Sequence, residues 1–139
     1  MEKVYTVWDY HDGPRTGIAD YRGRPHYYSC QFDQSADEYG NTYALFPIDA
    51  NTFALALEQW AIWQAWEIAF HSGQVSTESH PGNDGRDSRC DELKRLLQHR
   101  LEALPASNIH VYARFHSSPQ GATEIGPMEK FFVGWSDAD

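Results

Sequence analysis

Three side chains near the middle of the chain are of the types that bind metal ions. Glu67 and His71 stand four positions apart, and His80 follows after a loop rich in turn-forming residues. On a helix, residues four apart lie on one face, so Glu67 and His71 can point toward the same site. With His80 they would form a set of two imidazoles and one carboxylate, which zinc and non-heme iron accept. The spacing allows a divalent metal such as zinc as a cofactor.

The same residues also have an interpretation without any cofactor, and it is the one we favour. The E-x-x-x-H spacing differs from the H-E-x-x-H arrangement of zinc peptidases, in which two histidines flank the general base. A histidine in the last turn of a helix interacts favourably with the negative end of the helix dipole. Glu67 would then pair with His71, and His80, which precedes Pro81, would be a turn residue.

The helix that holds the first two of these residues is predicted over 52–72. Asn51 is suited to cap its start, and Gly73 is suited to end it in a left-handed conformation. Apolar side chains cover most of its circumference, which predicts a mostly buried helix lying across a sheet. The exception is a narrow polar stripe formed by Gln64, Glu67 and His71. Polar side chains next to a hydrophobic core need hydrogen-bonding or charged partners, so this stripe is a candidate site. The candidate polar site consists of Gln64, Glu67, His71 and His80.

Strand patterns lie on both sides of this helix in the sequence. A second helix starts near Ser88, with apolar residues at intervals of three and four, and Pro105 stops it. Together these elements predict an α+β fold in the order β-β-β-β-α-α-β-β, with a mainly antiparallel sheet of about five strands packed against the two helices. The predicted strand segments are 3–10, a hairpin over 18–33 with Arg22-Gly23 near its tip, 42–48, 108–117 and 130–135.

Two other groups of residues are candidates for function. The segment 108–117 alternates strictly between apolar and polar residues, which is typical of a half-buried strand. Its polar face, together with Trp60, is a candidate binding surface made of Trp60, His110, Tyr112, Arg114 and His116. The N-terminal acidic loop could do acid–base chemistry through paired carboxylates, although turn capping and an Arg–Asp pair are favoured. Its members are Asp9, Asp12, Arg15 and Asp20.

The charge of the chain limits its partners. Twenty acidic against eleven basic residues give a net charge of −9, which repels nucleic acid and anionic membranes and favours a basic protein. The N-terminus carries no apolar signal segment, and Cys30 and Cys90 form no pairing motif, which predicts a cytoplasmic protein with reduced thiols. The length predicts a single domain over 1–139, with 135–139 as a frayed acidic tail.

These observations favour a non-enzymatic module that binds another protein. The chain has no phosphate-binding loop, dinucleotide fingerprint or nucleophile elbow. An acidic inhibitor or an immunity-type protein that covers a basic surface would fit, and a homodimer is compatible with the sequence. Two alternatives stay open: a metal-dependent hydrolase that uses Glu67, His71 and His80, and a protein that binds a small aromatic ligand beside the tryptophan-rich helix.

The central third of the chain also resembles a group of small uncharacterised bacterial proteins. Their pattern is W-x-x-W-E-x-A-F-H-x-G, followed by H-P and then a helix. The resemblance implies a small cytoplasmic bacterial domain, and it implies no activity. The matching positions are Trp63, Trp66, Glu67, Ala69, Phe70, His71, Gly73, His80 and Pro81.

Overall fold

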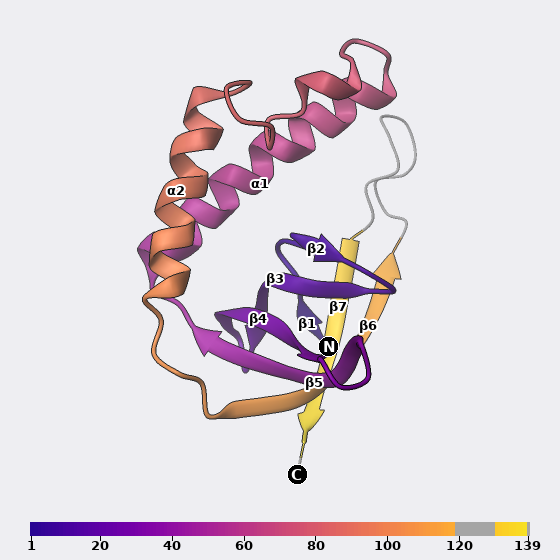
Figure 1. Ribbon diagram of the computed structural model, residues 1–139, viewed down its shortest axis with the longest axis vertical. Helices are drawn as coiled ribbons and strands as arrows, with labels where there is room; N and C mark the ends of the chain where they lie inside the picture. The colour runs from indigo at the N-terminus through magenta and orange to yellow at the C-terminus, as the bar shows by residue number, and fades with distance from the viewer. Residues whose placement is uncertain (119–129, 139) are drawn as a thin grey trace. The chain divides into compact units, whose positions relative to one another are not determined.

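The computed structural model describes residues 1–118 and 130–138, and it divides the chain into two compact units (Figure 1). Among the described residues, the sheet unit contains 1–49, 104–117 and 131–138, and the helical unit contains Ala50–Ala103. The chain is therefore α+β, as predicted. Whether it behaves as one domain over 1–139 stays a prediction.

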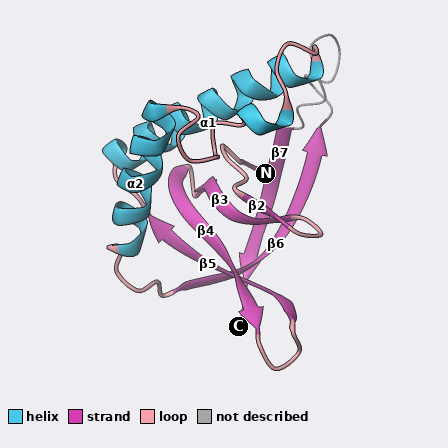
Figure 2. Cartoon of the chain, turned by 45° about the horizontal axis from the view of Figure 1, so that its top comes forward, coloured by secondary structure: helices cyan, strands magenta, loops and turns pink. Residues whose placement is uncertain are grey.

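Within the described residues, seven strands form one curled antiparallel sheet (Figure 2). Their order across the sheet is β1-β7-β6-β5-β4-β3-β2. The prediction of about five strands is roughly compatible with this sheet but not exact. The predicted order contains six strands, and the seventh arises because the N-terminal segment forms two short strands rather than one. The strands are β1 (Glu2–Lys3), β2 (Asp9–Tyr10), β3 (Pro14–Tyr21), β4 (Arg24–Asp33), β5 (Glu38–Pro47), β6 (Ile109–Ser118) and β7 (Lys130–Asp137).

The first ten residues join the two ends of this strand order. β1 pairs with β7, and β2 pairs with β3. Between them, the amide of Val4 donates to the carbonyl of Phe131 on β7, and the amide of Tyr5 donates to the carbonyl of Ile18 on β3. The backbone groups at both ends of the sheet are thus used within the chain, and this pairing curls the sheet.

The β3–β4 hairpin turns at Arg22 and Gly23, as the sequence predicts. Both residues have positive φ angles, 53° and 76°, which suit the tight two-residue turns that match the twist of paired strands. The carboxylate of Glu2 accepts hydrogen bonds from both of their amides, at 2.9 and 2.7 Å. The N-terminal segment therefore also holds the tip of this hairpin.

Aromatic rings fill the interior of the sheet unit. Tyr28 is fully buried, and the Tyr28 and Tyr43 rings lie 5.7 to 6.2 Å from those of Phe115 and Trp135. Their polar tips are satisfied as buried tyrosines require, because Tyr28 donates to the carbonyl of Thr6 and Tyr43 to that of Pro14. Trp135 belongs to this core and lies on β7, so the prediction of a frayed tail from residue 135 was wrong. Asp139 lies outside the described residues.

Gly17 on β3 allows the N-terminal segment to approach closely. A Cβ atom at this position would lie 2.6 Å from the Tyr28 hydroxyl oxygen and closer still to the carbonyl oxygen of Thr6. Real Cβ atoms do not approach other atoms so closely. The hydrogen bond from Tyr28 to Thr6 therefore depends on a residue without a side chain at position 17.

In the helical unit, α1 (Ala50–His71) is followed by a short 3-10 helix, η1 (Thr77–Ser79), and by α2 (Ser88–Glu102). The helix α2 begins at Ser88 as predicted, and Asp87 caps it by accepting the amide hydrogen of Cys90. Arg89 of α2 donates through Nε and Nη2 to the carboxylate of Glu58 on α1, at 2.6 and 2.7 Å. Among the described residues, no helix has the length and hydropathy needed to cross a membrane.

The prediction of a mostly buried α1 was wrong at several positions. Leu57 and Ile68 are 39% and 38% exposed. The buried face instead contains Gln59, which the sequence analysis had not singled out as a polar position of this helix. Helical periodicity identified which residues share a face, but an almost uniformly apolar helix does not indicate which face is covered.

We expect Gly17→Ala to lower the free energy of unfolding by about 3 kcal/mol, because the added methyl group overpacks the contact between Thr6 and Tyr28. Urea denaturation followed by circular dichroism measures this. Gly134→Ala is the matched control: it lies on β7, where an added Cβ atom meets its nearest neighbour, the Arg114 carbonyl, only at 4.0 Å. Equal stability of the two variants would contradict this account of Gly17.

Ionisation of Tyr5 is expected to lower the stability of the sheet unit at alkaline pH. Its hydroxyl donates to Asp20 at 2.9 Å, and burial together with this acidic partner raises the pKa of Tyr5 to about 12. An unfolded tyrosine ionises near pH 10. The contribution of Tyr5 to stability is therefore fully present below pH 10 and is lost as the pH rises toward 12.

We expect Tyr5→Phe to flatten the loss of stability between pH 10 and 12, because the variant has no phenol to ionise at this position. Urea denaturation midpoints measured at intervals from pH 8 to 12 test this. Parallel curves for the variant and the natural sequence would show that Tyr5 is not responsible.

Candidate binding site

Five residues of the helical unit line a pocket of about 170 Å³. Four of them are on α1, at positions i, i+3, i+4 and i+7, so they share one face of the helix. The fifth comes from the loop that follows η1. We call this site the Trp–Glu pocket, and its lining residues are Trp60, Trp63, Gln64, Glu67 and His80.

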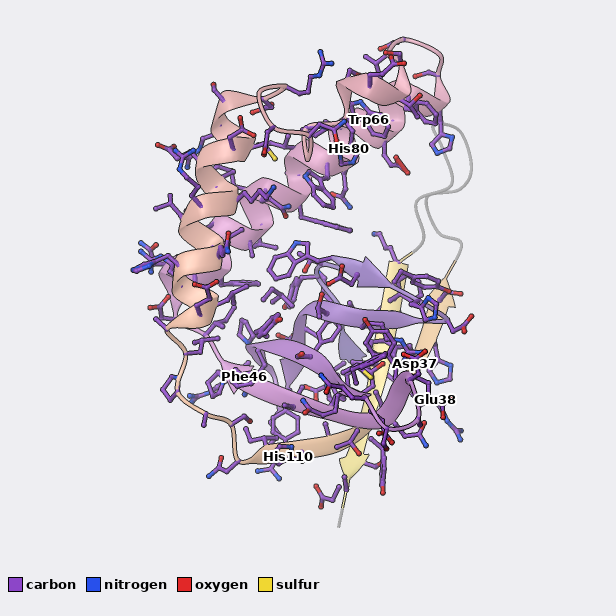
Figure 3. The ribbon with its side chains drawn as sticks, in the orientation of Figure 1. Asp37, Glu38, Phe46, Trp66, His80 and His110 are labelled. Carbon is purple, nitrogen blue, oxygen red and sulfur yellow. The ribbon has the colours of Figure 1, made fainter. Side chains whose placement is uncertain are left out.

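His80 is held against α1 by aromatic contacts. Its ring meets Trp63 and Trp66 at centroid distances of 5.0 and 4.6 Å, with ring planes inclined by 73° and 68°. Figure 3 shows Trp66 and His80 side by side. The Nδ1 atom accepts the amide hydrogen of Gly82 at 2.9 Å. This nitrogen is therefore engaged by the backbone of its own loop.

The loop around His80 is fixed by further contacts with the end of α1. The indole N–H of Trp66 donates to the Ser79 hydroxyl at 2.9 Å, and that hydroxyl donates to the carbonyl of Ser76 at 2.7 Å. Phe70 stacks on Trp66 with ring planes only 10° apart. Gly82 allows this close packing, since a Cβ atom there would lie 3.0 Å from His80 Nδ1 and would push the ring aside by a few tenths of an ångström. The loop therefore places the His80 ring at the pocket.

Glu67 supplies the negative charge of the pocket. His71 Nε2 lies 3.7 Å from Glu67 Oε1, with side chains 35% and 39% exposed. An exposed pair at this distance contributes at most about 1 kcal/mol, so it does not tie up the carboxylate. The predicted pairing of Glu67 with His71 is thus present, and Glu67 is still able to bind a second partner.

The predicted metal set is not assembled. Among the described residues, no three His, Cys, Asp or Glu side chains are placed to hold a metal ion together. Glu67 and His71 meet, but His80 uses Nδ1 to accept from Gly82 and has its ring between two indoles. The arrangement gives the zinc hypothesis no support.

The Trp63 side chain links the pocket to the buried side of the helical unit. Its Nε1 atom is buried and reaches no oxygen or nitrogen acceptor. Its polar neighbour is the Cys90 thiol, a weak acceptor. Burial raises the pKa of Cys90, and the indole N–H opposes that rise. Trp63 was not among the predicted site residues. Its spacing from Trp60 and Glu67, three and four positions along the helix, is the sequence signal that it lines the same site.

The other candidate surfaces lie in the sheet unit. His110, Tyr112, Arg114 and His116 are all exposed on β6, while Val111 between them is buried, which confirms the predicted alternation. Their role in binding stays a prediction. Trp60, which was grouped with them, belongs instead to the Trp–Glu pocket.

The N-terminal acidic loop is organised by backbone contacts. Arg15 donates to the carbonyl oxygens of His11 and Asp12, at 2.6 and 3.3 Å, so its bond to Asp12 is to the backbone and not to the predicted carboxylate. Asp9 accepts from the Thr16 hydroxyl at 2.7 Å. Asp20 accepts from Tyr5, as described above. These contacts support the structural interpretation of Asp9, Asp12, Arg15 and Asp20.

We expect His80→Ala to detach the loop from α1, because the change removes two aromatic contacts and the acceptor for the Gly82 amide. The expected cost is about 2 kcal/mol. Limited proteolysis within 72–87 and hydrogen exchange at the Gly82 amide measure this opening. His116→Ala, at an exposed histidine on β6, is the control. Unchanged protection in His80→Ala would show that other contacts hold the loop.

No protein-family model, curated protein sequence or solved structure matches this chain. The resemblance to small bacterial proteins therefore stays a prediction. The function is therefore inferred from the residues of the chain, and in the Trp–Glu pocket aromatic side chains and a carboxylate line one cavity.

Proposed function

We propose that the protein is a non-enzymatic binding module that accepts a cationic group of a basic partner protein in the Trp–Glu pocket. The observation that carries this proposal is that two indole side chains and a half-exposed carboxylate line the same small pocket. Aromatic faces attract cations through their quadrupole, and a carboxylate adds a charge-assisted hydrogen bond.

The size of the pocket favours one side chain as its occupant. Sites for whole cofactors or drug-sized ligands usually measure roughly 300 to 1,000 Å³. The Trp–Glu pocket has about 170 Å³. This volume suits a single charged group of a larger partner, and it favours protein binding over the alternative of a free aromatic ligand.

The binding free energy that the pocket can contribute also favours a protein as the partner. A cation–π contact contributes about 0.5 to 2 kcal/mol, and an exposed ion pair contributes at most about 1 kcal/mol. Together these stay below the roughly 4 kcal/mol that corresponds to a dissociation constant near 1 mM. The pocket alone would bind weakly, so we infer that it anchors one group within a wider contact. The net charge of −9 would attract a basic partner over a longer range.

A capped six-residue peptide of alternating Arg and Lys tests the proposal. We expect it to bind the natural sequence and to quench or shift tryptophan fluorescence, with an affinity that falls as salt is raised. Glu67→Gln keeps the shape of the side chain and removes its charge, so we expect about a fivefold loss of affinity. A six-residue Glu peptide is expected not to bind.

Glu38→Gln is the matched control, because it removes the same charge from an exposed residue of the sheet unit, at the β4–β5 turn (Figure 3). We expect it to change the affinity by less than twofold. If both variants lose affinity equally, binding depends on diffuse charge and the pocket has no part in it. If indole binds and the basic peptide does not, the small aromatic-ligand alternative replaces the proposal.

A further inference from the structure

We infer that the cationic group taken by the Trp–Glu pocket is the guanidinium of an arginine side chain, and this inference rests on the proposed function. A guanidinium is planar, stacks on aromatic faces, and carries its N–H donors around its edge. Lysine presents a compact ammonium ion instead, whose charge is strongly hydrated. The aromatic walls and the acceptors of the pocket favour the planar guanidinium over the ammonium ion.

The walls of the pocket suit a flat ion. Trp60 and Trp63 are one helical turn apart, with ring centroids 6.0 Å apart and ring planes inclined by 36°. Both indoles line the pocket, so together they offer a ligand a broad aromatic surface. A planar ion can lie against such a surface with its edge free to donate hydrogen bonds, whereas a tetrahedral ammonium contacts it only through one side.

The acceptors of the pocket suit the edge of that ion. Glu67 follows Trp63 and Trp60 by one and two turns on the same face, and its two carboxylate oxygens can accept a pair of parallel N–H bonds. Gln64 adds an amide oxygen on the same face. A lysine ammonium would use these acceptors less fully, because its three donors diverge.

His80 completes this set with an aromatic ring. Its Nδ1 accepts from the Gly82 amide, so this nitrogen is bonded to the backbone of its own loop. The aromatic contacts to Trp63 and Trp66 hold it in place. An ion in the pocket would lie beside the two indoles and the imidazole, and it would exchange part of its hydration for aromatic surface. Guanidinium is more weakly hydrated than ammonium, so it loses less on entering such a site.

Capped hexaarginine and capped hexalysine test the inference, since they have the same length and charge and differ only in the head group. We expect hexaarginine to bind the natural sequence at least threefold more tightly and to shift the indole N–H signals of Trp60 and Trp63 in ¹H–¹⁵N spectra. Glu67→Gln and Trp60→Leu should each bring the ratio of the two affinities close to one. Glu38→Gln should leave the ratio unchanged.

The possible outcomes separate the inference from the proposed function. If hexalysine binds as tightly as hexaarginine or more tightly, or if the ratio is the same in Glu67→Gln, the guanidinium inference is wrong. In that case the proposed function still stands, provided that the alternating peptide depends on Glu67. If neither homopeptide binds and the alternating peptide does not depend on Glu67, both are wrong. Circular dichroism of each variant confirms that it is folded.

Discussion

The close approach of the N-terminal segment to β3 and β4 is the constraint on which the sheet unit depends. Thr6 lies where Gly17 has no side chain, its carbonyl accepts from the buried Tyr28 hydroxyl, and its own hydroxyl accepts the amide hydrogen of Ile18 at 2.9 Å. These bonds fix the segment that joins β7 to β3. Without them the sheet would have two open edges, which are sites of non-specific pairing between chains. One glycine thus permits a closure that many backbone hydrogen bonds then stabilise.

In the helical unit, an irregular loop packs against the aromatic side chains of α1. The loop has few apolar residues of its own to bury, and Gly82 leaves space for the His80 ring. The indole N–H of Trp66 compensates by bonding the Ser79 hydroxyl, and the imidazole accepts from the Gly82 amide. Polar groups that would otherwise be costly beside the rings are thereby satisfied. The same contacts place the His80 ring at the edge of the pocket.

The sequence predicted the helices and most strands of this chain, but it did not predict the contacts that residues distant in sequence make with one another. Alternation along 108–117 and the Arg22-Gly23 turn identified β6 and the β3–β4 hairpin, because each depends on neighbours in the sequence. The division of 3–10 into β1 and β2 depends instead on pairing with β7 and β3, which only the folded chain brings near. The metal hypothesis also depended on an arrangement that sequence spacing alone does not determine, namely the position of His80 relative to Glu67 and His71. The spacing of Glu67 and His71 was informative, whereas the orientation of His80 is set by Trp63, Trp66 and Gly82.

Trp63 lines the candidate site and also takes part in the packing of the helical unit. Trp63 holds His80 with its ring and has its buried N–H near Cys90, so its orientation is set from within the helical unit. An aromatic wall that is already ordered loses little conformational entropy when a ligand arrives. Trp60 and Glu67 lie one turn to either side of it on the same helix, so their relative spacing is fixed by the helical backbone. The pocket is therefore preorganised by contacts that the protein needs for folding in any case. A weak interaction there would be selective in spite of its small energy, because a mismatched group would meet walls that do not adapt to it.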